Sequence, residues 1–544
     1  MDTVSLPLSQ VPKSSKLLVD YVERHDHVAR YYNGSPFAPE TYDNLGRQLH
    51  NIRTDRKTLV EVLLKQNKAF GAGEETLRNI QRLSHPETLA VVTGQQVGLL
   101  SGPAFTLYKA LMAIRLSQSL NERGLQNVPV FWLASEDHDL EEVAQTYALN
   151  DDYEAVHLHD PGERPAPQSA VGRVKLTGGV SEVLDRLESL LQPAGDGAQL
   201  LDDLRIAYRP GNTWSQAFAQ FLTRLFGRWG VILLDPMDEA IHALAAPIYQ
   251  RGLRQADEFR SLLQKRSVEL VKAGYHAQVH VVEDSTLLFA DREGNRLPVH
   301  SSAAGGKEFS IGDGQTTSLS ELENEINDRP LNFSANVLLR PVVQDSLLPT
   351  IAYVAGPSEL AYLGQSQVLY SALDRPMPAV FPRCGFTLLD RRVERWMEKY
   401  QVTVEDIWHG QDHLSQHIAA TALSEGWSER FDQTEKDLAK LLSRLRKDIE
   451  VLDPTLLDTL NHTEEKIQFQ VEKLKGKLAR SVLSRSEVLG RHEQALLRAI
   501  MPEKELQERL VSGVYFLGRA GYGLLDRLLD RISADSPGHY IMGF

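Results

Sequence analysis

The fold of this chain is decided by the stretch LAVVTGQQVGLLSGPAFTLYK, residues 89–109. An apolar run, Leu89–Val92, ends in a loop rich in glycine and glutamine, and a helical pattern starts directly after Gly102-Pro103. Proline is well tolerated at the first helical position, because its fixed φ suits a helix start. The stretch therefore predicts a strand, a loop and a helix. The N-terminal N–H groups of this helix would point beyond the strand end, at a place that suits an anion such as phosphate.

The loop supplies the first candidate binding residues. These are Thr93, Gly94, Gln95, Gln96 and Gly98, with Gly102 at the helix start. Lys109 follows about two turns into the helix, and its side chain leans back toward the helix start, where it would add positive charge. The loop matches neither the Walker A pattern nor Gly-x-Gly-x-x-Gly. An ordinary connection between strand and helix therefore stays open as the alternative to a ligand site.

Composition narrows the class of protein. The chain has 544 residues, which is enough for about three domains. Its formal charge of −14 argues against a nucleic-acid binder, and its single cysteine, Cys384, excludes internal disulfides and zinc ribbons. No stretch approaches the roughly 18 apolar residues that cross a bilayer, and the first residues lack the apolar region of a signal peptide. We expect a cytoplasmic globular protein that binds neither nucleic acid nor membrane.

Further apolar runs predict the rest of a sheet. They are Val128–Leu133, Val231–Leu234, Pro349–Val354 and, more weakly, Met377–Phe381. Helical patterns follow the better-defined runs, for example over Ala104–Leu120 and Asp238–Arg251. Apolar strands that alternate with helices are typical of an α/β fold whose parallel sheet is covered on both faces. In such sheets, ligands bind outside the carboxyl ends of the strands.

Insertions interrupt this core. The alternating segment Gln278–Val282 predicts the first strand of a β-meander, and the turn residues Arg292–Asn295 predict a later hairpin. We divide the chain into core segments at 1–150, 211–275 and 336–390, insertions at 151–210 and 276–335, a helical arm at 391–515, and a C-terminal segment, 516–544, that returns to the core.

Heptad spacing predicts the arm. Phe431, Leu438, Leu445 and Leu452 recur every seven residues, Pro454 breaks the pattern, and Leu460, Ile467 and Leu474 resume it. Two long helices joined by a short break indicate an antiparallel coiled coil, with a bundle packed on the core as the alternative. Such an arm commonly pairs with a second copy, so we expect a homodimer.

A cluster of acids and a histidine follows the strand that contains Trp132. The residues are Glu136, Asp137, His138 and Asp139, and Trp132 at the end of the strand joins them as a candidate binding residue. They could hold a divalent metal, supply a general base, or bind a substrate amine or sugar hydroxyls. The structural alternative is a helix start with Ser135 as N-cap and acids in the first turn, which would not explain His138. Whether a metal is bound is left open by the sequence.

A third cluster surrounds the later strands. Its candidate binding residues are Arg340, Gln344, Asp345, Gly356, Glu359 and Arg383. Gly356-Pro357 again starts a helical pattern after a strand, so two helix starts would meet near one crevice. Arg340 could bind a carboxylate or phosphate in bidentate fashion, or pair with Asp345 instead. Cys384 next to Arg383 reads as a buried, inert thiol rather than a nucleophile.

These motifs resemble a known family. Thr93-Gly94-Gln95-Gln96, Glu136–Asp139 and Arg340-Pro341 with Gln344-Asp345 are similar to the cysteine-adding enzymes of bacillithiol biosynthesis. The Ala355–Glu359 turn and the arm follow in the family's order, so the resemblance covers nearly the whole chain. It implies a Rossmann-like core related to nucleotidyltransferases, two connecting-peptide insertions and a coiled-coil arm used for dimerisation.

The resemblance also implies an activity. The family adds cysteine to glucosaminyl malate, and amide formation from a free carboxylate implies ATP, through an acyl-adenylate or an acyl-phosphate. The 93–98 loop would hold phosphate or carboxylate, and Lys109 would steady developing charge. Asp137, His138 and Asp139 would bind and deprotonate the amine, while Arg340 and Arg383 would bind the malyl carboxylates. A metal-dependent hydrolase that uses the acid–histidine cluster and a non-catalytic dimeric scaffold remain as alternatives.

Overall fold

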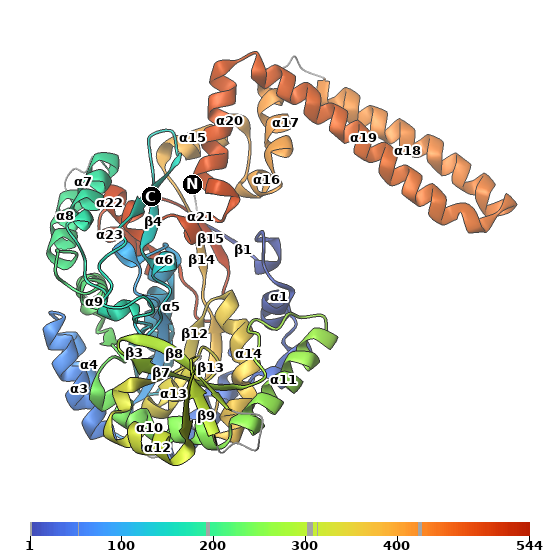
Figure 1. The fold of residues 1–544 in the computed structure, drawn as a ribbon. Coiled ribbons are helices and arrows are strands. Elements are labelled where there is room, and N and C mark those ends of the chain that lie inside the picture. Colours follow the sequence, from blue (N-terminus) through green and yellow to red (C-terminus); the bar gives the residue numbers. More distant parts are fainter. Residues whose placement is uncertain (1–2, 53, 192–195, 302–307, 313, 423–426) are drawn as a thin grey trace.

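A computed structural model describes residues 3–52, 54–191, 196–301, 308–312, 314–422 and 427–544. A thick globular body carries all the sheets, and a two-helix arm projects far from it (Figure 1). A small group of helices joins the arm to the body (Figure 1). No helix in the described part of the chain combines the length and the apolar character that a membrane crossing requires.

The body is built on a parallel sheet of five strands in the order β13-β12-β2-β3-β6. The strands are β2 (Leu89–Gln95), β3 (Asn127–Leu133), β6 (Ile232–Leu234), β12 (Thr350–Ala355) and β13 (Ala379–Pro382). Each of the five predicted apolar runs is therefore a strand of one sheet. From β2 the chain builds the sheet first toward β6 and later toward β13, so the strand order reverses between β2 and β12. Such a reversal opens a crevice at the carboxyl ends of the two strands.

Both faces of this sheet are covered, which explains why its strands read as continuous apolar runs. In β2, Leu89 and Val91 enter one core cluster while Ala90 and Val92 enter the other. Helices of the first face are α2 (Pro39–His50), α5 (Phe105–Glu122), α9 (Trp214–Phe226) and α23 (Gly523–Arg531). Helices of the second face are α1 (Lys16–Glu23), α3 (Arg56–Ala69), α10 (Glu239–Arg254), α11 (Ala256–Lys272) and α14 (Pro357–Ala372). The predicted α/β class with a Rossmann-like sheet is confirmed.

An antiparallel sheet of five strands, in the order β10-β9-β8-β7-β11, is inserted between β6 and β12. Its strands are β7 (Ser285–Arg292), β8 (Asn295–Ser301), β9 (Glu308–Ile311), β10 (Gln315–Ser318) and β11 (Phe333–Ala335). The hairpin turn after Arg292 is present as expected, but Gln278–Val282 is not a strand. Instead, the side chain of Gln365 on α14 bonds both backbone groups of Val279, at 2.9 and 3.0 Å. A side-chain clamp thus replaces the expected ladder.

The two ends of the chain meet in a third sheet. Strand β15 (His539–Gly543) pairs with β1 (Val4–Leu6) on one side and with β14 (Gly385–Leu389) on the other. A separate hairpin is formed by β4 (Gln145–Leu149) and β5 (Ala155–His159). Further helices around these sheets are α4 (Glu74–Arg82), α6 (Leu140–Val143), α7 (Gly179–Leu191), α8 (Asp196–Ala207), α12 (Leu319–Asp328), α13 (Arg340–Leu347), α21 (Gln507–Leu510) and α22 (Gly513–Ala520). Segments from both ends of the chain therefore pair with each other next to the body's parallel sheet.

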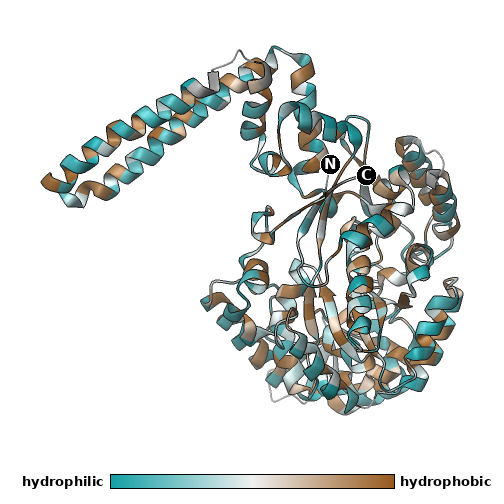
Figure 2. Ribbon diagram, turned by 180° about the vertical axis from the view of Figure 1, so that it is seen from behind, coloured by the Kyte–Doolittle hydropathy of each residue, from teal (hydrophilic) through white to brown (hydrophobic). Residues whose placement is uncertain are grey.

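The arm is an antiparallel hairpin of α18 (Trp427–Leu452) and α19 (Leu457–Ser484), with Pro454 in the turn between them. Its base consists of α15 (Arg391–Tyr400), α16 (Val404–Trp408), α17 (Gln411–Ala422) and α20 (Glu487–Ile500). Apolar residues recur in bands along both arm helices, interleaved with hydrophilic ones (Figure 2). The predicted coiled-coil arm is confirmed, and the alternative of a bundle packed on the core is not what the chain forms.

Candidate active site at the strand-order reversal

A cavity of about 640 Å³ lies where β2, β3 and β12 end, beside the reversal in strand order. This volume is in the range of about 300–1,000 Å³ that is usual for small-molecule sites. The candidate residues that line it are Gly94, Gln95, Gln96, Lys109, Trp132, Glu136, Asp137, His138, Arg340, Gln344, Gly356, Glu359 and Arg383. All three sequence clusters thus meet in one place, because parallel strands bring their carboxyl ends to one edge.

The expected anion cradle at the start of α5 is occupied by the protein itself. Ala104 N donates to Val511 O at 2.8 Å, and Pro103 forms a bridge with Ser512. Gly102 (φ 69°) and Gly98 form the tight turn in front of this helix, and neither lines the cavity. The two glycines therefore serve the turn, since a segment far along the chain covers the helix end that a ligand would need.

Three more candidates lie outside the cavity, because their side chains bond to other parts of the protein. The Thr93 hydroxyl donates to Val354 O at 2.9 Å and so ties β2 to β12. Asp139, not Ser135, is the N-cap of α6, and its Oδ1 accepts from Glu142 N at 3.1 Å. Asp345 is buried with Tyr370, whose hydroxyl donates to it, and does not pair with Arg340. These side chains hold the frame of the site.

Lys109 connects the two strand ends at the reversal. Its buried ammonium donates to Gly94 O and, at 3.2 Å, to Gln95 Oε1, and it lies 2.6 Å from Glu359 Oε2. Burial lowers the pKa of Lys109, although Glu359 counteracts this. Glu359 is held in turn by Gly356 N and by the Tyr353 hydroxyl, both at 2.7 Å. An ammonium has three N–H groups, so these partners use all of them.

Asp137 and His138 form an acid–histidine pair at the mouth of β3. Gln96 Nε2 donates to Asp137 Oδ2 at 2.9 Å, and His138 Nδ1 lies 3.7 Å from Asp137 Oδ1. Burial would raise the pKa of Asp137, but Gln96 and Arg296 outweigh it and lower the pKa below its usual value. The carboxylate is therefore charged at neutral pH. The His138 side chain lines the cavity and is 44% exposed.

Two arginines reach the same space from different segments. Arg340, at the start of α13, is held charged: burial opposes the charge, but Tyr362 and Tyr353 raise its pKa. Arg296 on β8 was not among the predicted residues. Its guanidinium stacks 3.7 Å from the centre of the Phe289 ring and lies 3.4 Å from His138 Nδ1. No local pattern in the sequence marks Arg296, since only the packing of the inserted sheet brings β8 over the strand ends.

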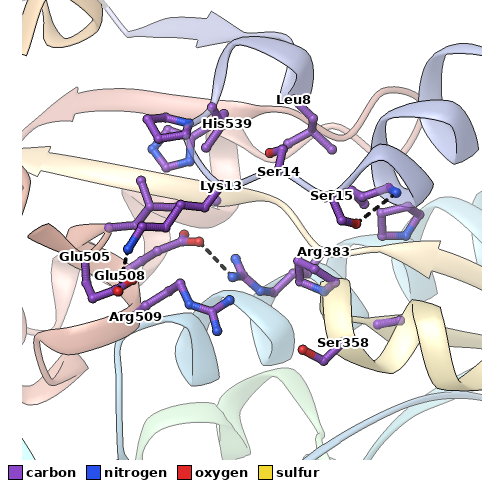
Figure 3. A pocket seen from close by; sticks show the side chains of 18 of the residues that line it. Leu8, Lys13, Ser14, Ser15, Ser358, Arg383, Glu505, Glu508, Arg509 and His539 are labelled. Carbon is purple, nitrogen blue, oxygen red and sulfur yellow. Dashed lines mark hydrogen bonds and ion pairs between the residues drawn. The ribbon is translucent and has the colours of Figure 1, made fainter. Parts of the chain in front are cut away.

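Arg383 lines both this cavity and a neighbouring one of about 270 Å³. Its Nη2 donates to Glu508 Oε1 at 2.7 Å, and Arg509 lies beside this pair in the smaller cavity (Figure 3). Arg509 also lines the larger cavity. Arg383 is thus paired by the protein, whereas Arg509 is exposed and was missed by the sequence analysis. Burial raises the pKa of the adjacent Cys384 to about 12, which agrees with an inert thiol.

The acid–histidine stretch does not gather three metal ligands. Among the described residues, the only group of three histidine, cysteine or carboxylate ligand atoms within 4.8 Å of one another belongs to Asp406, His413 and His417, in the base of the arm. Asp139 caps α6, and Glu136 pairs with His242 at 3.4 Å. This geometry gives the metal-dependent hydrolase no support.

The fold and the site define a class of protein: an α/β enzyme with a doubly wound, Rossmann-like core, a polar small-molecule cavity at the strand-order reversal, and a coiled-coil arm. Family models narrow this class. The N-terminal Rossmann-like domain of bacillithiol biosynthesis BshC matches residues 1–384, and the C-terminal coiled-coil domain of BshC matches residues 386–544. The chain therefore belongs to the bacillithiol biosynthesis BshC family.

Relatives match over almost their whole length. The chain is 36% identical to a protein of Koribacter versatilis over 99% of both chains, and 35% identical to one of Solibacter usitatus over 98% of both. It is 32% identical to one of Salinibacter ruber, over 97% of this chain and 96% of the other. Each is named "Putative cysteine ligase BshC". The predicted family and the ligase class are thereby confirmed, while the likeness of the core to nucleotidyltransferases stays a prediction.

Proposed function

We propose that this protein adds cysteine to glucosaminyl malate, in the last step of bacillithiol biosynthesis, through an ATP-activated cysteine carboxylate. Family membership supports the pathway and the ligase class. One observation carries the choice of acceptor: a single cavity joins the Asp137 carboxylate and the His138 imidazole with the guanidinium groups of Arg340 and Arg296. A carboxylate beside a histidine suits an amine nucleophile, and arginines suit carboxylates.

Glucosaminyl malate has one amine and two carboxylates, so it would use both kinds of group. Asp137 would hold the amine as an ammonium ion, and the exposed His138 would accept its proton before attack. Arg340 would bind a malyl carboxylate in bidentate fashion. Arg383, which Glu508 already pairs, and Lys109, whose N–H groups are all used, would position other residues rather than bind substrate.

The activation step is proposed to be adenylation. The cysteine carboxylate attacks the α-phosphorus of ATP and pyrophosphate leaves; the amine then attacks the acyl carbon and AMP leaves. An acyl-phosphate would instead release ADP in the first step and phosphate in the second. We choose the acyl-adenylate over the acyl-phosphate by analogy of the core with nucleotidyltransferases.

Reconstitution tests this proposal. Purified protein is incubated with glucosaminyl malate, cysteine and ATP, and the thiol product and nucleotides are measured by mass spectrometry. Product with stoichiometric AMP is the expected result. ADP in place of AMP would contradict the adenylate but keep the ligase, and product without nucleotide consumption would overturn ATP activation. If the folded protein formed no product, glucosaminyl malate would not be its acceptor substrate.

Replacing His138 tests the general base. His138→Ala should lower kcat by about a hundredfold or more, because general-base catalysis typically contributes at least that factor. The product assay above gives the measurement. His157→Ala provides the control, because His157 lies in the β4–β5 hairpin and does not line the cavity. Full activity of His138→Ala would remove His138 from the mechanism.

The arm is proposed to pair two copies of the chain. After α18 and α19 have packed on each other, large apolar side chains remain exposed on both, among them Leu445 (51%) and Phe469 (62%). A second copy would cover such residues, since isolated helical hairpins rarely leave apolar bands in water.

A further inference from the structure

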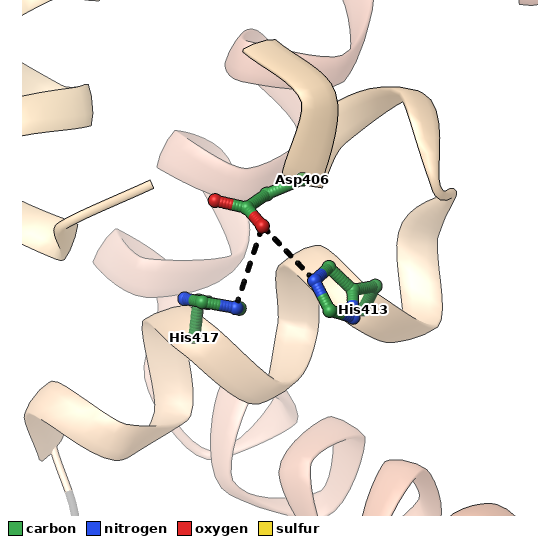
Figure 4. A group of neighbouring side chains, drawn as sticks. All are labelled: Asp406, His413 and His417. Carbon is green, nitrogen blue, oxygen red and sulfur yellow. Dashed lines mark hydrogen bonds and ion pairs between the residues drawn. The ribbon is translucent and has the colours of Figure 1, made fainter. Parts of the chain in front are cut away.

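Three side chains of the kinds that ligate metal ions converge in the base of the arm, outside both cavities described above. Asp406 comes from α16, and His413 and His417 come from successive turns of α17 (Figure 4). His413 Nε2 lies 3.0 Å and His417 Nε2 lies 3.7 Å from the same oxygen, Asp406 Oδ1. The three side chains thus direct two imidazole nitrogens and one carboxylate oxygen at one point.

The spacing fits a tetrahedral metal ion. Zinc bonds to nitrogen and oxygen of about 2.0–2.1 Å, at tetrahedral angles, separate neighbouring ligand atoms by about 3.4 Å. The distances of 3.0 and 3.7 Å from Asp406 Oδ1 bracket that value. Histidines four residues apart lie on one face of a helix, and the two rings have centroids 4.8 Å apart. Only small side-chain adjustments would therefore be needed to enclose an ion.

The carboxylate is already oriented for this role. Asp406 Oδ2 accepts from Thr403 N at 2.7 Å and from the Thr403 hydroxyl at 3.0 Å, as part of the capping box of α16. These bonds hold the second oxygen, Oδ1, toward the histidines. Supporting hydrogen bonds of this kind orient the ligands of metal sites. The histidines are partly exposed, so an ion can reach them from solvent.

We propose that Asp406, His413 and His417 form a structural site for a zinc-type divalent cation. Two imidazoles and one carboxylate favour zinc, nickel or cobalt over the all-oxygen sites of calcium and magnesium. The ion would fasten α16 to α17 and so stiffen the base from which the arm projects. A water molecule would complete the coordination. The site is independent of the proposed reaction, because none of its residues lines the catalytic cavity.

Metal titration of the full-length protein tests the site. Protein stripped with EDTA is titrated with Zn²⁺ by calorimetry, and bound metal is counted by elemental analysis after desalting. We expect one equivalent per chain and a rise in melting temperature on binding. His413→Gln and His417→Gln should each weaken binding about a hundredfold, and the double variant should lose both the equivalent and the thermal shift. Glutamine is close to histidine in size and is a good helix former, and both positions are partly exposed, so the variants should fold.

His462→Gln is the matched control. His462 on α19 also lies beside a carboxylate, Glu465, at 3.4 Å, but it belongs to no group of three ligands among the described residues. Its replacement should leave zinc stoichiometry and affinity unchanged. Two results would overturn the site: an unmodified protein that retains no zinc equivalent, or a double variant that binds zinc as tightly as the unmodified protein. If only His138→Ala removed the bound zinc, the metal would belong to the catalytic cavity instead.

Discussion

A single ammonium group, that of Lys109, joins the end of β2 to the start of α14. Its partners Gly94, Gln95 and Glu359 all line the candidate active-site cavity. The sequence predicts that Lys109 lies at the site, but not that its N–H groups are all occupied. The third N–H group of Lys109 is occupied by Glu359, which lies 250 residues further along the chain.

Removing this ammonium should destabilise the fold as well as the site. Lys109→Met leaves Glu359 without its cation, and breaking a buried ion pair on one side costs about 3–5 kcal/mol. Urea unfolding followed by circular dichroism measures the change. Adding Glu359→Gln to Lys109→Met should restore part of the loss, because no unpaired carboxylate remains. A double variant as unstable as the single one would show that packing, not charge, is responsible.

Asp345 makes stability depend on pH. Burial raises its pKa from 3.8 to about 6, so the folded protein binds this proton more tightly than the unfolded chain does. The contribution of the protonated Asp345 to the free energy of unfolding is therefore fully present below about pH 4. It is lost as the pH rises through about 6, by about 3 kcal/mol in total. Asp345→Asn should remove this dependence.

The measurement is the free energy of unfolding of both proteins from pH 4 to 7. The difference between the original protein and Asp345→Asn should shift in favour of the variant as the pH rises. A difference that stays constant over this range would mean that Asp345 titrates as it does in the unfolded chain.

Strand β2 and helix α5 show how elements shape the site. The periodicity of residues 89–109 correctly predicts both elements. It does not reveal that residues 511 and 512 cover the start of α5, because the pairing joins segments about 400 residues apart. The cavity lies at the strand ends, whereas residues 511 and 512 cover the start of the helix.

Gly94 is required where β2 and β3 approach each other. A Cβ at this position would lie 2.7 Å from the carbonyl oxygen of Trp132, so the strands would have to separate. Gly94→Ala should lower the free energy of unfolding by about 1–3 kcal/mol and should reduce activity by displacing a carbonyl that binds Lys109. Gly178→Ala is the control, since its Cβ would meet nothing within 4 Å. Equal stability of the two variants would contradict this account.

The assembled molecule consists of a globular body that holds the candidate active site and an arm that projects from it (Figure 1). Heptad spacing predicts the arm because that pattern is local and repeats over many turns. The inserted sheet is different: its strands are recognisable in part, yet its contribution of Phe289 and Arg296 to the cavity appears only once the sheet has packed against the core.

Arm-mediated pairing has a direct test. Leu445→Glu together with Phe469→Glu should convert a dimer into a monomer, because charges would have to be buried between the two arms. Light scattering after size-exclusion chromatography gives the mass, and circular dichroism checks that helices persist. Val268→Glu is the control, an exposed apolar residue on α11 in the body. A monomeric original protein, or a variant that stays dimeric, would refute pairing through these residues.

The amino-acid sequence by itself determined the alternation of strands and helices, the heptads of the arm and the three polar clusters, which follow β2, follow β3 and surround β12 and β13. These properties depend on neighbouring residues, and parallel strands necessarily bring their carboxyl ends together. Only the tertiary structure decided which of those residues line the cavity. Burial of Asp345, closure of the α5 start by residues 511 and 512, and the arrival of Arg296 all arise from contacts between distant segments, and such contacts leave no local pattern.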